Sequence, residues 1–493
     1  MFHISDLYLF APEATVALLA LAVMMVDLFV KRRIVTVTVA LVGLIVPLGF
    51  AIAQAVTPGY LSTPHYAFFG MLVIDPFAVF FEIVFLMIVA VMLLASYSYV
   101  GKYVKADGEF YTLMLFSATG MMFLASTNEL ITIYISLELT SIPLYVMAGL
   151  LRTGERSAEA AVKYVLLGAM SSAILLYGFA LLYGLTGTTD LAGIARSVMT
   201  GVQNGNVLIL LADLLILAGF GFKISAVPFH MWAPDIYEGA PTPAAAFFSV
   251  GSKAAGFAAL IRIFTSGGLG HVNLASLTII IAIIAIATMT LGNFVAAVQS
   301  NVKRMMAYSS IAQAGYILVG FLASISGKSS DGNSAVLFFI LVYVITNLGA
   351  FSGIIALANA TGGEKIEDFR GLAKRAPILS AGTALCLLSL GGIPPMAGFV
   401  SKVFIFTAAW GAGLSWLVVI ALLNTVVSLV YYGRIVKAMY FDAPLKEDHL
   451  TMPIGLSSSI TLTTAALVVI TFAASLVLEL TGPAANMLAF LVK

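Results

Sequence analysis

Long apolar runs constrain the fold of this sequence more than any other feature. Fourteen stretches of about 20 residues are nearly free of charge, which is the length that a helix needs to cross the hydrocarbon core of a membrane. Only 10% of the 493 residues are charged, against about 25% in soluble domains. Because backbone polar groups in lipid must be paired within each segment, we expect an all-α polytopic membrane protein.

The spans follow one another with short connections and no inserted soluble domain, so residues 1–493 are predicted to form a single transmembrane domain. The first apolar run lacks a basic leader region and a small-residue cleavage site, and we interpret it as a retained span. The predicted spans are 8–30, 34–56, 75–99, 110–127, 129–150, 158–185, 207–238, 242–264, 273–297, 302–325, 335–359, 378–408, 413–440 and 456–480.

Lysine and arginine are distributed unevenly between the two sides of the predicted membrane. Because these residues accumulate in cytoplasmic loops, we expect the richer side to be cytoplasmic and both termini to lie on the other side. The richer side carries sixteen basic residues: Lys31, Arg32, Arg33, Lys102, Lys105, Arg152, Arg156, Lys303, Arg304, Lys365, Arg370, Lys374, Arg375, Arg434, Lys437 and Lys446. The other side carries Arg196, Arg262, Lys328 and Lys493.

Two spans are too long for one crossing and are interrupted by proline, at Pro228 in span seven and at Pro394-Pro395 in span twelve. Each proline frees a backbone carbonyl. One such break is common in membrane helices, but two in corresponding positions point to a transport site. Spans four to eight (110–264) and nine to thirteen (273–440) are therefore predicted to be two inverted five-helix repeats, preceded by three helices (1–109) and followed by one (456–480).

Composition also excludes several kinds of site. The net charge of +1 offers no electrostatic surface for nucleic acid. Cys386 is the only cysteine, which excludes internal disulfides and four-cysteine iron–sulfur or zinc centres. No glycine-rich phosphate loop follows a strand pattern. We therefore expect the chain to bind no metal, redox cofactor or nucleotide of its own.

The four remaining basic residues are all lysines inside apolar spans: Lys163, Lys223, Lys253 and Lys402. Lys223 lies at the break of span seven, where an ammonium is costly unless it is hydrated or paired. Such a group can load and release a proton, so we predict a relay station; the alternative is a structural ion pair. Lys253, among small residues, and Lys402, just after the break of span twelve, are predicted to be further stations, with the same alternative.

Glu138, near the centre of span five, is the natural counter-charge for a lysine on a neighbouring helix. We predict that separation of Glu138 from Lys223 acts as a switch, against the alternative of a static salt bridge. Lys163, nearer the cytoplasmic end of its span, and His230, just past the first break, are predicted to be accessory, although snorkelling and a simple hydrogen bond compete. Further polar residues of the spans and their ends carry weaker predictions. Glu82 and Asp213 are candidate titrating groups, and Gln313 and Tyr316 could hold water molecules. Asp27, Asp235 and Glu238 are expected to be ordinary helix-end charges.

Three motifs resemble one known family. Lys223 to Pro243, which contains Pro-Phe-His-Met-Trp-Ala-Pro-Asp, is similar to a signature of the antiporter-like membrane subunits of respiratory complex I. Asn301 to Ile311 and Gly392 to Lys402 are similar to two others. Ser249-Val-Gly-Ser-Lys253 and a lysine at position 402 look like the N subunits (subunit 2) of that family. Gln313 departs from the family pattern, since many relatives carry histidine there.

This resemblance implies a proton-pumping subunit of NADH:quinone oxidoreductase in the inner (plasma) membrane, and so part of an enzyme, a translocase. NADH, FMN, iron–sulfur clusters and quinone would be bound by other subunits, and the partners would be neighbouring antiporter-like and small membrane subunits. Glu138, Lys223, Lys253 and Lys402 would be the proton-channel residues and Lys163 the accessory lysine. Two alternatives stay open, a subunit of a multisubunit cation/proton antiporter and a non-conducting scaffold.

Overall fold

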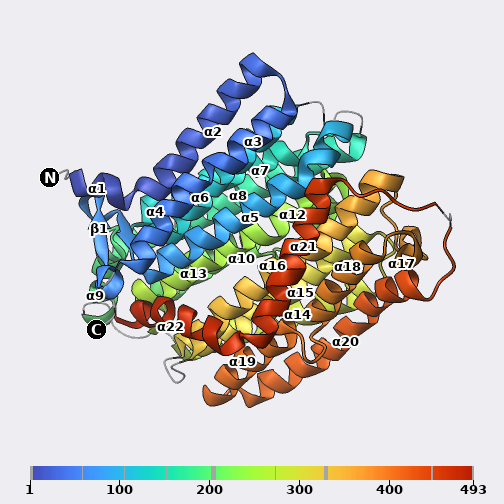
Figure 1. The fold of residues 1–493 in the computed structure, drawn as a ribbon. Helices are drawn as coiled ribbons and strands as arrows, with labels where there is room; N and C mark the ends of the chain where they lie inside the picture. Colours follow the sequence, from blue (N-terminus) through green and yellow to red (C-terminus); the bar gives the residue numbers. More distant parts are fainter. Residues whose placement is uncertain are drawn as a thin grey trace.

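The computed structural model describes residues 4–57, 59–104, 106–151, 154–200, 207–271, 274–326, 331–445 and 448–490. Apart from one short hairpin, its regular elements are helices packed side by side (Figure 1). Of the basic residues counted above, Lys105, Arg152, Lys328, Lys446 and Lys493 lie outside the described residues.

Twelve helices of the described chain are long and apolar enough to cross a membrane. Together with α6, which is less apolar, and with the paired half-helices α18 and α19, they account for the fourteen predicted spans. The helices up to the first break are α1 (Ile4–Leu9), α2 (Ala11–Val30), α3 (Arg33–Gly43), α4 (Ile45–Val56), α5 (Pro76–Tyr103), α6 (Asp107–Ser126), α7 (Leu130–Ala148), α8 (Glu155–Thr186), α9 (Leu191–Thr200) and α10 (Val207–Ile224).

The two predicted breaks lie between α10 and α11 and between α18 and α19, and the remaining helices follow the first break. They are α11 (Trp232–Gly239), α12 (Thr242–Phe247), α13 (Lys253–Ser266), α14 (Leu274–Ala297), α15 (Val302–Ile325), α16 (Gly332–Thr361), α17 (Leu372–Arg375), α18 (Pro377–Gly391), α19 (Ala397–Gly411), α20 (Ser415–Tyr440), α21 (Ile454–Phe472) and α22 (Ala474–Phe490).

Both breaks contain a residue with positive φ directly after the first half-helix. In the first break this is Ser225, at φ 59°, and in the second it is Gly392, at φ 80°. A left-handed residue cannot continue a right-handed helix, and the prolines that follow cannot supply the missing N–H groups. The positions of the discontinuous helices are therefore confirmed.

The two five-helix blocks pack in the same pattern. α6 lies against α7 as α14 lies against α15, and α8 packs on both α10 and α11 as α16 packs on both α18 and α19. Four crossings lie between the end of α6 and the beginning of α14, so α14 begins on the side of the bundle where α6 ends. This is the arrangement of inverted repeats. One buried core cluster extends from α2 to α22, and the finer division into blocks stays a prediction.

Several elements were not predicted. A short antiparallel hairpin pairs β1 (His65–Ala67) with β2 (Leu72–Ile74). The helix α9 lies between the sixth and seventh spans and packs on α8 and α13. The predicted span 456–480 contains nearly all of α21 and the beginning of the separate helix α22, which packs against α5 and α16.

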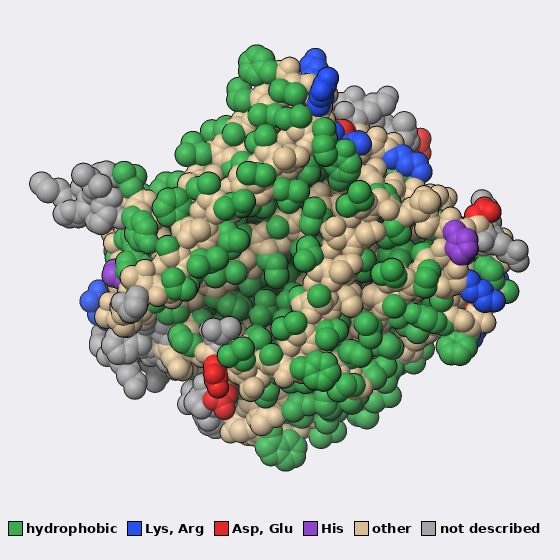
Figure 2. All heavy atoms as spheres, viewed as in Figure 1, with side chains coloured by type: hydrophobic (Ala, Val, Ile, Leu, Met, Phe, Trp, Pro, Cys, Tyr) green, Lys and Arg blue, Asp and Glu red, His purple; other side chains and the backbone are tan. Residues whose placement is uncertain are grey.

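Hydrophobic side chains cover most of the face in Figure 2, and the charged side chains lie near its margins. Exposed large residues such as Leu18, Leu166, Phe294 and Leu423 come from helices spread along the chain. A soluble protein rarely exposes so much contiguous apolar surface. The surface is therefore that of a multi-pass membrane protein.

Candidate functional site

Three of the four predicted lysines are deeply buried. Lys223 is 5% exposed, Lys253 2% and Lys402 3%. They come from the end of α10, the beginning of α13 and the second turn of α19. A buried ammonium must be held by hydrogen-bond acceptors, and the acceptors of each lysine define the site.

Lys223 is held by α7. Its Nζ donates to Ser141 Oγ at 2.7 Å and to Tyr145 OH at 3.2 Å. The break beside it is closed by Trp232 of α11, whose indole N–H donates to the carbonyl of Phe222 at 2.7 Å. The lysine thus lies where α7 meets the discontinuous helix.

Glu138 is not paired with Lys223 in this structure. Its Oε1 is buried without a hydrogen-bond partner among the described residues, while Lys223 binds Ser141, one turn further along α7. The expected contact between the two charges is therefore absent. The ammonium instead occupies a position in which it is separated from the carboxylate.

Lys253 is held by α15. Its Nζ donates to the carbonyl of Ser310 at 2.6 Å and to Ser310 Oγ at 2.7 Å. A π-helical turn, Phe248–Ser252, directly precedes it. Such turns are rare and frequently occur at functional positions, and this one was not predicted.

Polar side chains of α16 lie beside that π-helical turn. Tyr343 donates to the carbonyl of Ser249 at 2.9 Å, and Asn347 Nδ2 donates to Ser249 Oγ at 2.5 Å. Two hydrogen-bonding side chains of α16 therefore bind Ser249 of this turn.

Lys402 is held by the carbonyls that the second break sets free. Its Nζ donates to Leu390 O at 3.2 Å and to Gly391 O at 3.3 Å, and it lies 4.8 Å from the centre of the Tyr316 ring. Carbonyls at a helix C-terminus favour a cation. The interruption of α18 thus creates the binding site of the lysine.

Gln313 joins the second break to α15. Its Nε2 donates to Leu390 O at 3.1 Å, the same carbonyl that binds Lys402, and lies 3.4 Å from Tyr432 OH. Tyr432 also hydrogen-bonds Ser309, which is the neighbour of Ser310. Polar groups therefore lead from Lys253 to Lys402 along one face of α15.

A small cavity lies against Lys402, with Gln313 and Tyr343 among its lining residues. Its volume is about 10 Å³, close to the minimum space for one water molecule. The space beside Lys402 is therefore nearly filled by side chains.

Lys163 is not buried, since its side chain is 40% exposed. It forms ion pairs with Glu159 at 2.7 Å and with Asp235 at 2.8 Å. Asp235 also pairs with Arg304 at 2.7 Å. Partial burial opposes ionisation of Asp235, but the hydrogen bonds from Lys163 and Arg304 outweigh it and lower the pKa of this carboxyl.

Glu238 extends this network, which we call the mouth cluster: Arg156, Glu159, Lys163, Asp235, Glu238 and Arg304. Glu238 pairs with Arg304 at 3.0 Å and with Arg156 at 3.6 Å. The six side chains line a pocket of about 240 Å³ at the edge of the bundle. Asp235 and Glu238 are therefore more than the isolated helix-end charges that the sequence suggested.

His230 is half-buried in the connection between α10 and α11, and its Nδ1 has no partner among the described residues. Its neighbour Met231 is 74% exposed. No described contact joins His230 to the three buried lysines, and its accessory role stays a prediction.

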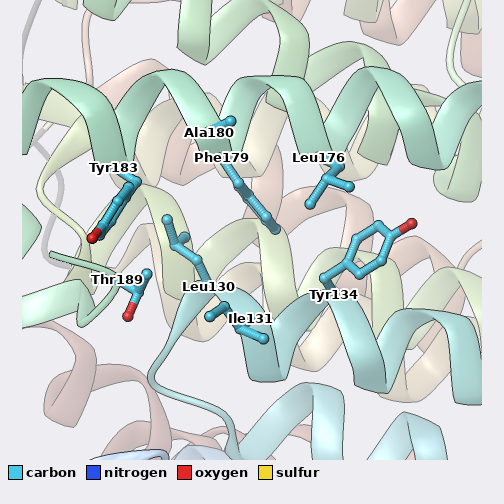
Figure 3. A pocket seen from close by; sticks show the side chains of 8 residues that line it. All are labelled: Leu130, Ile131, Tyr134, Leu176, Phe179, Ala180, Tyr183 and Thr189. Atoms are coloured by element: carbon cyan, nitrogen blue, oxygen red, sulfur yellow. The ribbon is translucent and has the colours of Figure 1, made fainter. Parts of the chain in front are cut away.

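Two other features of the described chain lie apart from the lysines. The groove between α7 and α8 in Figure 3 is apolar and is lined by no charged side chain. No group of three His, Cys, Asp or Glu side chains is arranged as metal ligands in the described part. The apolar groove therefore does not contribute to the lysine site.

Sequence reasoning missed the hydroxyl and amide groups that hold the lysines, above all Ser141, Tyr145, Ser310 and Tyr432. The only available signal was their polarity within apolar spans, and many serines in membrane helices simply bond their own backbone. Ser136, one turn and a half before Ser141, does so: it donates to the carbonyl of Thr132 at 2.7 Å.

Comparison with known proteins agrees with this architecture. Residues 127–428 match the family model described as NADH:quinone oxidoreductase/Mrp antiporter, TM. NADH-quinone oxidoreductase subunit N of Desulfitobacterium hafniense is 44% identical over 425 residues, covering 81% of this chain and 85% of the relative.

Solved structures give the same result. A chain of respiratory complex I from Thermus thermophilus with bound aureothin is 31% identical, with a TM-score of 0.78, and covers 96% of this chain and 100% of that one. A chain of the Mrp complex from Dietzia sp. has a TM-score of 0.86 over 99% and 98% of the two chains at 20% identity, which shows a shared fold alone. The chain described here therefore belongs to the NADH:quinone oxidoreductase/Mrp antiporter transmembrane family.

Proposed function

We propose that this chain is a proton-translocating membrane-arm subunit of a NADH:quinone oxidoreductase, of the N type. The relative that is 44% identical carries that name. The observation that carries the proposal is the row of polar groups between Lys253 and Lys402. Lys253 binds Ser310, the neighbouring Ser309 bonds Tyr432, and Gln313, which lies beside Tyr432, shares the carbonyl of Leu390 with Lys402.

In this proposal protons enter at the mouth cluster, where Lys163 faces water. Lys223 receives a proton while it is bound to Ser141 and Tyr145, and movement of its ammonium between these hydroxyls and Glu138 is the switch. Lys253 then takes the proton, because Ser310 supplies two acceptors within 2.7 Å. Gln313 and a water in the small cavity connect Lys253 to Lys402, from which the proton leaves on the opposite side.

The remaining expectations belong to the same proposal. The face with the mouth cluster is cytoplasmic, both termini lie on the other side, and the membrane is the inner (plasma) membrane. The chain contributes to an enzyme but carries no redox or nucleotide site, so NADH, FMN, iron–sulfur clusters and quinone are bound by other subunits. Quinone reduction there changes the charges that act on Glu138 and Lys223.

The direct test is proton pumping by the assembled complex in membrane vesicles. We expect Lys253→Ala to lower the ratio of protons pumped to electrons transferred, because the relay loses its central station. Lys102→Ala, at an exposed lysine outside this chain of contacts, is the matched control. A fully assembled Lys253→Ala complex with the wild-type ratio overturns the relay.

The same vesicles test the alternative that the chain is a subunit of a cation/proton antiporter, which we consider because it shares its fold with a chain of the Mrp complex. An antiporter subunit exchanges Na⁺ for protons without any electron donor. We expect no Na⁺-driven change of internal pH in the absence of NADH and quinone. A Na⁺-driven change that Lys253→Ala abolishes would favour the antiporter.

A further inference from the structure

A second group of buried charges lies away from the lysines, where α2, α5, α6 and α13 meet. Glu13 is in the first turn of α2, Asp75 caps α5, and Glu82 is in the second turn of α5. All three carboxyl side chains belong to fully buried residues, as does Arg262 of α13. These groups lie near the end of α6 opposite to Asp107 and therefore on the face away from the mouth cluster.

Asp75 and Arg262 satisfy each other. The guanidinium of Arg262 donates to the two oxygens of Asp75 at 2.9 and 3.0 Å, and its Nε donates to the carbonyl of Ala125 at 2.9 Å. Asp75 also accepts from the backbone N–H of Ala78 at 2.8 Å. Three of the five N–H donors of Arg262 are thus used, two of them by Asp75, and no hydrogen bond joins Arg262 to Glu13 or Glu82 among the described residues.

Glu13 and Glu82 have no such partner. Ser126 donates to Glu13 Oε1 at 2.9 Å, but Glu13 Oε2 and both oxygens of Glu82 have no hydrogen-bond partner among the described residues. The charged groups that act on Glu82 are Glu13 and Asp75, which are both acidic. If all three carboxyl groups were ionised, three buried negative charges would be accompanied by the single buried guanidinium of Arg262.

A buried carboxylate without a counter-charge costs several kcal/mol even after relaxation. A proton can neutralise such a carboxylate. A metal ion would need several ligand side chains, and the described residues contain no group of three His, Cys, Asp or Glu side chains placed to bind one. Ser126 fits either state of Glu13. Its hydroxyl also lies 3.2 Å from the carbonyl of Met122, so it can donate there while it accepts a hydrogen bond from protonated Glu13.

We propose that Glu13 and Glu82 form a proton-binding site that holds one proton between them on the face opposite to the mouth cluster. The site is separate from the lysines, since the contacts described above connect it to Ser126 of α6 and to no residue of the relay. It places a titratable pair on the three N-terminal helices, outside the two repeats.

Infrared difference spectroscopy of the purified complex tests the site directly. A protonated carboxyl gives a carbonyl-stretch band that shifts in D₂O. We expect this band to lose intensity in Glu82→Gln and to change position in Glu13→Gln, because each variant removes one of the two groups that share the proton. Glu479→Gln, at an exposed residue of α22, should leave it unchanged. Spectra of Glu82→Gln and wild type that coincide overturn the proposal.

A second test uses the wild-type protein, so it does not depend on whether a substituted chain folds. Dicyclohexylcarbodiimide adds to protonated carboxyls in apolar surroundings, and mass spectrometry locates the adduct. We expect modification at Glu82 or Glu13, suppressed at high pH, and none at Asp75, whose two oxygens are bound by Arg262. An intact complex without an adduct at either glutamate, or with one at Asp75 alone, overturns the proposal.

Discussion

Ser141→Ala is the perturbation that most directly tests how Lys223 works. In the structure the ammonium binds Ser141 rather than Glu138, which lies three residues earlier on the same helix. If these two groups are alternative partners of one ammonium, removing the hydroxyl shifts Lys223 toward the carboxylate. The charge pair then stays closed, and proton transfer through Lys223 is slowed.

The size of the effect follows from the contact that is lost. A hydrogen bond to a charged group contributes about 1.5–3 kcal/mol, and the 2.7 Å distance to Ser141 Oγ is shorter than the 3.2 Å distance to Tyr145 OH. We therefore expect Ser141→Ala to change the balance between the two positions by roughly 10- to 100-fold. Tyr145→Phe should have the smaller effect.

The assay is proton pumping and quinone reduction by the assembled complex in vesicles. Ser136→Ala is the matched control, because Ser136 is buried on the same helix but bonds only the carbonyl of Thr132. In the double variant Ser141→Ala with Glu138→Gln, the two effects should not add, since both changes act on one ammonium. Simple additivity, or wild-type pumping by Ser141→Ala, refutes the reasoning.

Three further predictions concern the other stations. The Lys402→Arg complex should assemble but pump protons poorly, because guanidinium can bind the carbonyls of Leu390 and Gly391 but does not release its proton. Full pumping would show that position 402 needs only a fixed positive charge. Gln313→Leu should lower the pumping rate about 30-fold by removing two hydrogen bonds of about 1 kcal/mol each. Gln313→His should retain more activity, and equal rates for the two variants would contradict this. The carboxylate of Asp235 holds the mouth cluster together. Because its pKa is lowered, the cluster is complete above the usual aspartate pKa and loosens only as pH falls through the lowered value. Asp235→Asn should slow proton uptake at neutral pH, measured as the initial pumping rate, and an unchanged rate would exclude the cluster from the proton path.

The helical breaks and the buried lysines could be predicted because their causes are local. Proline lacks the N–H that continues a helix, and an ammonium within an apolar run has no partner in sequence. Hence Pro228 and Pro394 marked the discontinuities, and Lys223, Lys253 and Lys402 were expected to be buried.

The rest depended on tertiary contacts that no local pattern encodes. The choice of Lys223 between Ser141 and Glu138 is a competition between two neighbours on another helix. Lys163 lies inside α8 as expected, but no local pattern shows its ion pair with Asp235 of α11, which also binds Arg304. The π-helical turn before Lys253 arises where Tyr343 and Asn347 of α16 bind Ser249.

The hydrogen bonds of α15 have a consequence for the kinetics of the relay. Ser310, which binds Lys253, and Gln313, which shares a carbonyl with Lys402, are three residues apart on one uninterrupted helix. With a rise of about 1.5 Å per residue, their spacing along the axis is about 4.5 Å and hardly changes with thermal motion. The gap between Ser310 and Gln313 therefore has a constant width, and gating requires movement of side chains, such as those of Lys223, Lys253 and Lys402.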